Sequence, residues 1–204
     1  MKALITRKLG MTTTLSDKGA ATAVTLLTAA PNIVTQIKSS DTDGYQAIQL
    51  GAEQSKKIGR AQEGHLIKSK ANARIMREFR IKDEAELELN IGDQLAADIF
   101  SVGDLVDATA VNKGKGFAGV IKRHGFARGR KTHGGRSYRR PGSIGSMFPQ
   151  RIFPGKKMAG RMGGQQVTVK NLKIAIVDPK HNLIGVAGAI PGPRKGLVLL
   201  KEAK

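Results

Sequence analysis

Cysteine is absent from the 204 residues of the chain. This absence excludes a disulfide scaffold, a thiolate metal site, an iron–sulfur cluster and a cysteine nucleophile. The chain also lacks any apolar run close to the roughly 20 residues that span a bilayer. Its first eight residues, MKALITRK, contain no apolar segment long enough for a secretory signal. We therefore expect a cytoplasmic protein that does not contact a membrane.

Acidic residues are missing from one long part of the chain. The chain carries 35 Lys and Arg against 16 Asp and Glu, a net charge of +19. Residues 1–107 hold 14 basic and 14 acidic side chains, whereas residues 108–177 hold 16 basic and no acidic ones. Because carboxylates repel phosphates, this exclusion favours a polyanionic partner. A disordered basic linker is the alternative interpretation.

Regular hydrophobic periodicity is missing from residues 111–165. This stretch contains 13 of the 25 glycines and five of the eight aromatic residues. Such a segment cannot bury enough of its own surface to form a globular domain. We expect residues 112–164 to form an extended, basic, glycine-rich loop that becomes ordered against a large external surface.

Short β-type runs separated by turns occupy both flanks of this loop, and many strands at such spacing are typical of a closed antiparallel barrel. The expected fold is mostly β, with one barrel built from residues 1–111 and 165–204. A turn at residues 16–19 is expected to join the first two runs as a hairpin. A small helical segment is expected near residues 65–77. The predicted strands are residues 11–15, 22–27, 33–38, 45–50, 91–95, 102–106, 167–177, 183–190 and 197–200.

Motifs for catalysis or cofactor binding are incomplete. Residues 114–119 match G-x-G-x-x-G, but a dinucleotide site needs a βαβ unit and an acid about 20 residues later. The next acid is Asp178. His124 and His133 have no carboxylate nearby to complete a metal site, and the serines of the loop have no local carboxylate to support a nucleophile. We expect no enzyme activity, no cofactor, no metal and no small-molecule substrate.

Cations and aromatic rings spread along the loop instead indicate an RNA interface. A protein that reads DNA concentrates its contacts on a helix that fits the major groove. Irregular cationic backbone suits folded RNA, and Arg favours bidentate phosphate contacts. The predicted RNA-binding residues are Lys113, Lys115, Gly116, Phe117, Lys122, Arg123, His124, Arg128, Arg130, Lys131, His133, Arg136, Arg139, Arg140, Ser143, Arg151, Lys156, Lys157 and Arg161.

Three segments of the loop occur in a familiar order: KGKGFAG at residues 113–119, RPGSIG at 140–145 and GKKMAGRMG at 155–163. They closely resemble the bacterial large-subunit ribosomal protein L-three family. LGMT at residues 9–12 and DGYQAIQ at 43–49 are also similar to that family. The resemblance therefore covers nearly the whole chain.

The resemblance implies a barrel like those of translation factors, anchored on large-subunit rRNA. It implies a basic loop that extends toward the peptidyl-transferase region, and a structural role that nucleates early subunit assembly. It implies no catalysis. The expected protein neighbours are L-fourteen and L-nineteen. A free-standing RNA chaperone or RNA-modifying factor with an RNA-binding barrel is the alternative function.

One departure from the family lies after residues 140–145. Many bacterial members carry a methylated glutamine there, whereas this chain continues with SMFP at residues 146–149. Gln150 follows the proline instead of standing at the acceptor position. We therefore do not expect this modification.

Overall fold

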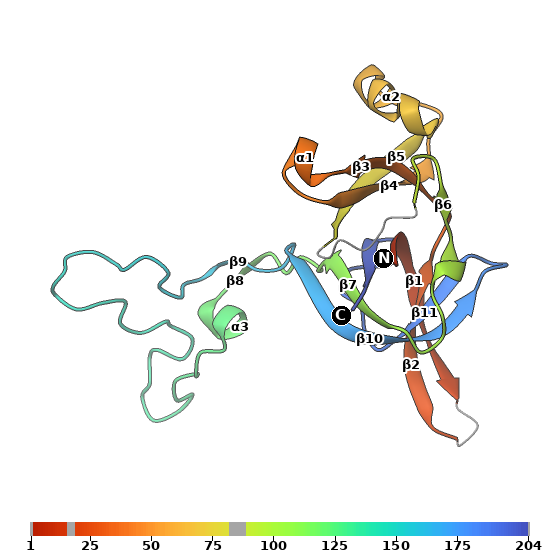
Figure 1. Cartoon of the computed structure of the whole chain (residues 1–204). Helices are drawn as coiled ribbons and strands as arrows, with labels where there is room; N and C mark the ends of the chain where they lie inside the picture. Colours follow the sequence, from red (N-terminus) through yellow and green to blue (C-terminus); the bar gives the residue numbers. More distant parts are fainter. Residues whose placement is uncertain (1, 16–18, 82–88, 204) are drawn as a thin grey trace. The chain divides into compact units, whose positions relative to one another are not determined.

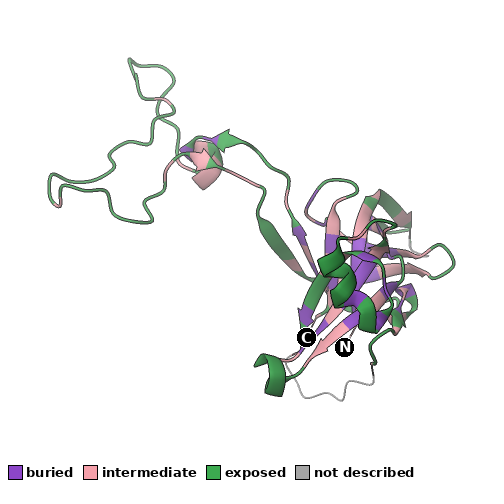
Figure 2. Ribbon diagram, turned by 90° about the horizontal axis from the view of Figure 1, so that it is seen from above, coloured by how far each residue is buried: buried purple, intermediate pink, exposed green. Residues whose placement is uncertain are grey.

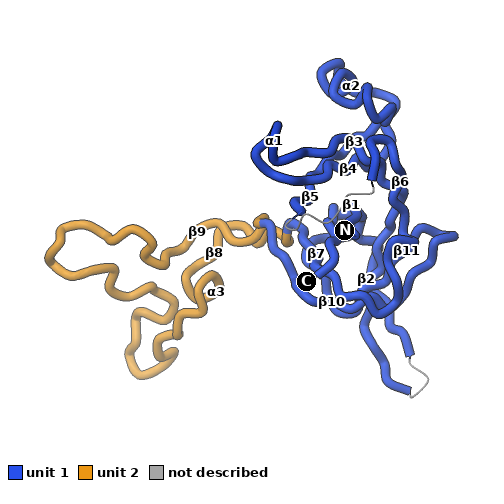
Figure 3. The backbone as a smooth tube through the Cα atoms, viewed as in Figure 1, with its two compact units in different colours: residues 1–111, 166–204 blue, residues 112–165 orange. Residues whose placement is uncertain are grey.

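The computed structural model of the chain describes residues 2–15, 19–81 and 89–203. It divides into two compact units, shown in Figure 3. Residues 1–111 and 166–204 make up the body, and residues 112–165 make up the extension. The hairpin turn expected at residues 16–19 lies outside the described residues except for Gly19.

Six strands of the body close into an antiparallel barrel (Figure 1). They are β1 (Ala3–Leu15), β2 (Ala21–Thr28), β7 (Leu105–Val111), β10 (Gln166–Asp178), β11 (Leu183–Ala187) and β12 (Leu197–Glu202). Their order around the barrel is β1-β12-β7-β10-β11-β2. The mostly β fold and the closed antiparallel barrel expected from the sequence are confirmed.

Alternate residues of these strands point into the barrel, as the period of an extended chain requires. In β12, Val198 and Leu200 are buried, and the intervening Leu199 is only partly buried. Leu4 of β1 is the register partner of Leu200, and both are fully buried. Figure 2 shows the buried residues gathered within the body. This core positions the two strands, β7 and β10, between which the extension is inserted.

The body contains a second sheet that the sequence did not separate from the barrel. Its strands are β3 (Asn32–Lys38), β4 (Ala47–Gln54), β5 (Ala73–Arg80) and β6 (Gln94–Leu95), in the order β5-β4-β3-β6. Val34, Leu50 and Phe79 of this sheet are buried in the same hydrophobic cluster as the barrel residues. The sequence predicted strands at residues 33–38, 45–50 and 91–95, but a helix at the start of β5, and it did not show which sheet each strand joins.

The prediction of a helix near residues 65–77 is wrong from residue 70 onward. The helix α2 (Arg60–Leu66) ends in a 3-10 turn at Ile67–Ser69, and Lys70 then adopts a left-handed φ of 52°. From Ala73 onward the chain is strand β5, paired with β4. Ala73 and Phe79 are buried and Ile75 and Met76 are partly buried, so Ala73, Ile75 and Phe79 lie on one face of the strand. The other short helical elements among the described residues of the body are α1 (Ser40–Asp43) and a 3-10 turn at Ala97–Ile99.

The extension contains little regular structure. Its elements are β8 (Phe117–Ala118), α3 (Val120–His124) and β9 (Gly160–Arg161), and β8 pairs with β9 as a two-stranded antiparallel sheet. Residues 125–159 contain neither helix nor strand. Most side chains of the extension are exposed (Figure 2).

Candidate nucleic-acid interface

All 19 residues predicted to bind RNA lie in the extension. Each is exposed except Arg123 and His124, which are half-buried. Every ion pair among the described residues lies in the body, and residues 108–177 contain no carboxylate side chain. The cationic side chains of the extension are therefore available to an external anion without competition from neighbouring acids.

The two legs of the extension are joined at their base by hydrogen bonds. The amide of Asn112 donates to the carbonyl oxygen of Gln165 over 2.9 Å, and the amide of Gln165 donates to Oδ1 of Asn112 over 3.1 Å. The amide of Lys115 donates to the carbonyl oxygen of Met162, and the amide of Met162 donates to that of Gly116, both over 2.9 Å. The legs therefore run side by side before they diverge.

Close approach of the legs requires glycine at position 163. Gly163 adopts a φ of 76°, and a Cβ there would overlap the carbonyl oxygen of Lys113. Any larger residue would be strained and would push the legs apart. Gly163 therefore supports the predicted RNA-binding residues around it, although it is not one of them.

Helix α3 is tied to the opposite leg through its last turn. Nη1 of Arg123 donates to the carbonyl oxygen of Met158 over 2.7 Å, and Nε2 of His124 lies 3.0 Å from the same oxygen. Gly125, with a φ of 71°, ends the helix. Arg123 and His124 thus hold the extension together, in addition to the RNA contact predicted for them.

A polar pocket of about 320 Å³ lies at the base of the extension. Lys115, Arg123 and Arg161 are its cationic lining residues, and no acidic side chain lines it. The lining also includes Asn112, His124, Met162, Gly163 and Gln165. Three cations around one polar pocket suit a phosphate group, because charge-assisted hydrogen bonds to phosphate oxygens are strong.

The distal part of the extension presents the other predicted residues to solvent, without joining them in one site. Ser143 donates to the carbonyl oxygen of Gly145 over 2.9 Å, which forms a local turn. Two apolar side chains that we did not predict as site residues, Met147 and Phe148, are 90% and 85% exposed. The feature of the sequence that could have identified these two residues is an apolar side chain within a segment that contains no acidic residue. The remaining exposed predicted residues of this region are Arg130, Lys131, His133, Arg136, Arg140, Arg151, Lys156 and Lys157.

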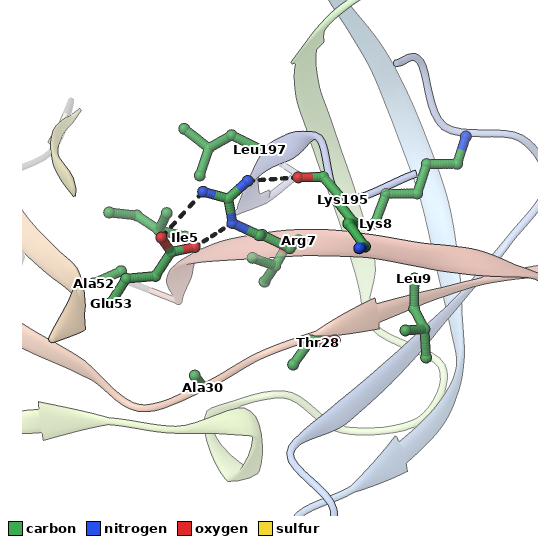
Figure 4. A pocket seen from close by; sticks show the side chains of 11 residues that line it. Ile5, Arg7, Lys8, Leu9, Thr28, Ala30, Ala52, Glu53, Lys195 and Leu197 are labelled. Atoms are coloured by element: carbon green, nitrogen blue, oxygen red, sulfur yellow. Dashed lines mark hydrogen bonds and ion pairs between the residues drawn. The ribbon is translucent and has the colours of Figure 1, made fainter. Parts of the chain in front are cut away.

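A pocket of the body that Arg7 lines has a different character (Figure 4). Arg7 donates through Nε and Nη2 to the carboxylate of Glu53 and through Nη1 to the carbonyl oxygen of Lys195. The hydrogen bond from Arg7 holds the pKa of Glu53 below its usual range, and burial opposes this shift. Most of the other lining is apolar, including Ile5 and Leu197. The guanidinium of Arg7 is therefore engaged within the body.

The described part of the chain contains neither a cluster of metal ligands nor a helix that could span a membrane. Within residues 2–15, 19–81 and 89–203, no three His, Asp or Glu side chains come together as a metal site requires. No helix formed by those residues has both the length and the apolar character needed to cross a membrane.

Comparison with known proteins gives one consistent result. The family model described as ribosomal protein L3 matches residues 46–182. The large ribosomal subunit protein uL3 of Geobacillus thermodenitrificans is 49% identical to the chain, over 99% of the chain and 96% of that protein. The uL3 proteins of Geobacillus stearothermophilus and Bacillus thuringiensis are 48% and 47% identical, over 99% of the chain and 95% and 97% of those proteins.

Proposed function

Since the chain belongs to the ribosomal protein L3 family, we propose that it binds large-subunit rRNA directly through the extension. Membership makes it a structural, non-enzymatic constituent of the large ribosomal subunit in the bacterial cytoplasm, where it associates with rRNA and other ribosomal proteins. One observation supports direct binding: the extension contains no acidic residue, and nearly all of its cationic side chains are exposed.

The base of the extension supports this proposal through its geometry. Hydrogen bonds between the legs hold Lys115 and Arg161 beside one polar pocket. Because these side chains already share a pocket, less conformational entropy is lost when a phosphate binds between them. Phosphate contacts of this kind supply much of the affinity of proteins for nucleic acids.

We further propose that the chain nucleates early assembly of the subunit and that the distal extension reaches toward the peptidyl-transferase region. The resemblance of residues 113–119, 140–145 and 155–163 to the family supports this proposal. The distal residues 125–159 contain no helix or strand. A segment without internal packing becomes ordered only against a surface supplied by its partner, and folding rRNA supplies such a surface.

The protein neighbours expected from the family, L-fourteen and L-nineteen, are proposed to contact the body. The β1–β2 ribbon supports a protein contact, because residues 9–15 and 19–28 include no charged side chain. Leu9, Met11 and Leu15 on this ribbon are 52%, 51% and 76% exposed. A neutral surface with exposed apolar side chains suits a protein partner better than a phosphate backbone.

Two measurements test direct rRNA binding by the extension and the presence of the chain in the large subunit. Ultraviolet crosslinking within purified large subunits, followed by peptide mapping, is expected to join rRNA to peptides from residues 112–165. Crosslinks confined to the body would overturn direct binding by the extension. Quantifying the chain across a high-salt sucrose gradient of cell lysate is expected to show near-equal stoichiometry with the large subunit. A predominantly free pool would instead indicate an RNA chaperone.

A further inference from the structure

We propose that a second pocket of the extension, lined by Phe117, Val120, Ile121, Lys122, Arg128 and Arg139, receives one unstacked nucleobase of the bound RNA. The pocket has a volume of about 500 Å³ and no acidic lining residue. The assignment rests on the proposed function, since it names the part of the RNA that this part of the extension recognises.

Phe117 forms the aromatic wall of the pocket. Its side chain is 81% exposed, although its backbone is fixed by pairing with Arg161 across β8 and β9. The neighbouring Ala118 and Val120 are 5% and 3% exposed, so they anchor the segment on either side of Gly119. The ring of Phe117 is thus presented outward from a fixed backbone. An exposed ring of this kind is a stacking platform for a base.

Arg128 and Arg139 also line the pocket, and both contact Tyr138. The amide of Gly129 donates to the carbonyl oxygen of Tyr138 over 3.0 Å, and Nη1 of Arg128 donates to the hydroxyl of Tyr138 over 3.3 Å. The guanidinium carbon of Arg139 lies 5.7 Å from the ring centroid of Tyr138. These contacts bring the two planar guanidinium groups to one pocket. Such groups stack on bases and donate to acceptors along the base edge.

The chemistry of the lining favours a base over a phosphate. Val120 and Ile121 are apolar, and together with Phe117 they offer no hydrogen bond from their side chains to phosphate oxygens. Three cations line each of the two pockets, Lys122, Arg128 and Arg139 here and Lys115, Arg123 and Arg161 in the polar pocket. Of the two, only this pocket has a phenyl ring and branched aliphatic side chains in its lining. Residues 115–124 therefore contribute to two pockets of different character. A nucleotide in an unpaired segment of RNA offers both groups, a charged phosphate and a flat base.

The first test separates stacking from charge. In the full chain, Phe117→Leu keeps an apolar side chain and removes the ring. We expect its affinity for isolated large-subunit rRNA to fall roughly 5- to 100-fold, the range of one base stacked on an aromatic side chain. The slope of log affinity against log salt should stay unchanged, because no phosphate contact is lost. Wild-type affinity, or a shallower slope, would overturn the assignment.

The second test uses the absence of tryptophan from the chain. Phe117→Trp introduces the one tryptophan of the chain and keeps an aromatic stacking surface. Its emission should be quenched when the rRNA binds, because the indole stacks on a base. The matched control is Val102→Trp, at a body residue that is 65% exposed and lies two residues before acidic Asp104. Its emission should change little. An unquenched indole at position 117 in the bound complex would contradict the pocket assignment.

These outcomes are distinct from failure of the proposed function. If the wild-type chain does not bind the rRNA, direct binding by the extension is wrong and the pocket assignment falls with it. If the wild-type chain binds with a steep salt slope but Phe117→Leu binds equally well, only the nucleobase pocket is wrong. Thermal melts of all variants, compared with the wild type, show whether the body remains folded.

Discussion

The side-chain amide of Asn32 exchanges two hydrogen bonds with the backbone of Ile5. The amide of Ile5 donates to Oδ1 of Asn32 over 2.9 Å, and Nδ2 of Asn32 donates to the carbonyl oxygen of Ile5 over 3.2 Å. Asn32 is fully buried at the start of β3, whereas Ile5 belongs to barrel strand β1. One polar side chain thus connects the barrel with the second sheet of the body.

Replacing this amide is expected to destabilise the body. Asn32→Leu keeps the branched shape and the number of side-chain heavy atoms but leaves the buried amide of Ile5 without its acceptor. An unsatisfied buried group costs about 1–3 kcal/mol of unfolding free energy, which urea unfolding would measure. The matched control is Gln54→Leu at an exposed position of β4, expected to change stability by less than about 0.5 kcal/mol. Equal effects of the two substitutions would contradict a structural role for the Asn32–Ile5 pair.

The base of the extension gives a second prediction. Gly163→Ala should force the two legs apart, because the new Cβ meets the carbonyl oxygen of Lys113 and φ is 76°. A left-handed residue other than glycine costs about 1–3 kcal/mol. We expect this cost to appear as weaker rRNA binding, by about 5- to 100-fold in a filter-binding assay, with little change in the melt of the body.

Gly114→Ala is the control for that substitution, since a Cβ at Gly114 meets no atom within 4 Å. It should bind rRNA like the wild type. If Gly163→Ala also bound normally, the close approach of the legs would not be needed for the interface.

Secondary structure was more predictable from the sequence than pairing. The short apolar run at residues 197–200 predicted a strand, but nothing local shows that β12 pairs with β1 and β7. The prediction of a helix through Arg77 is wrong because Ala73, Ile75 and Phe79 lie on one face of a strand. The spacing of the apolar residues in this segment does not distinguish a helix from a strand. That strand is stabilised by β4, a non-local partner.

The position of the predicted interface came from a property that the sequence carries directly, the absence of acids from residues 108–177. The roles of individual residues in this interface could not be predicted in the same way. Arg123 and Lys122 are adjacent cations, yet Arg123 is half-buried against the carbonyl oxygen of Met158 and Lys122 is exposed. The bonds between Asn112 and Gln165 join residues far apart in the chain, so local patterns cannot reveal them.

The salt dependence of rRNA binding gives a third prediction. If about eight phosphates are contacted, log affinity should fall with log salt at a slope of roughly −6 to −7. Arg161→Gln, which removes one cation from the polar pocket, should reduce the magnitude of this slope by about 0.7–0.9. Lys180→Gln in the body should leave it unchanged. A wild-type slope shallower than about −2 would show that the extension makes few phosphate contacts.

The Arg7–Glu53 pair predicts a pH dependence of stability. Its hydrogen bond lowers the pKa of Glu53 below the ordinary 4.5, so the pair stabilises the folded state above that pH and less as pH falls through the folded value. Glu53→Gln should therefore be less stable than the wild type at pH 7. The difference should be no more than about 1 kcal/mol for a partly exposed pair.

Urea unfolding at pH 7, 5 and 3 would measure this difference, which should shrink below about pH 4.5. Glu63→Gln removes an exposed carboxylate of α2 and controls for the loss of charge alone. A destabilisation by Glu53→Gln that is equally large at pH 3 would mean that lost packing, and not the ion pair, causes it.

The last prediction concerns the independence of the body. Val111 of β7 and Gln166 of β10 are register partners, so the ends left by removing residues 112–165 lie opposite each other in an antiparallel pair. A two-residue Asn-Gly turn suits such a connection. We expect this shortened chain to melt cooperatively, because the hydrophobic cluster of the body contains no residue of the extension.

The same shortened chain should lose most of its affinity for large-subunit rRNA, since 14 of the 35 Lys and Arg lie within residues 112–165. Circular dichroism melts would measure folding, and filter binding at two salt concentrations would measure affinity. A noncooperative melt would show that the extension contributes to the fold of the body. A folded body that keeps wild-type affinity and salt slope would place the RNA interface on the barrel or on the second sheet. The two readouts therefore test the division of the chain and the location of its interface separately.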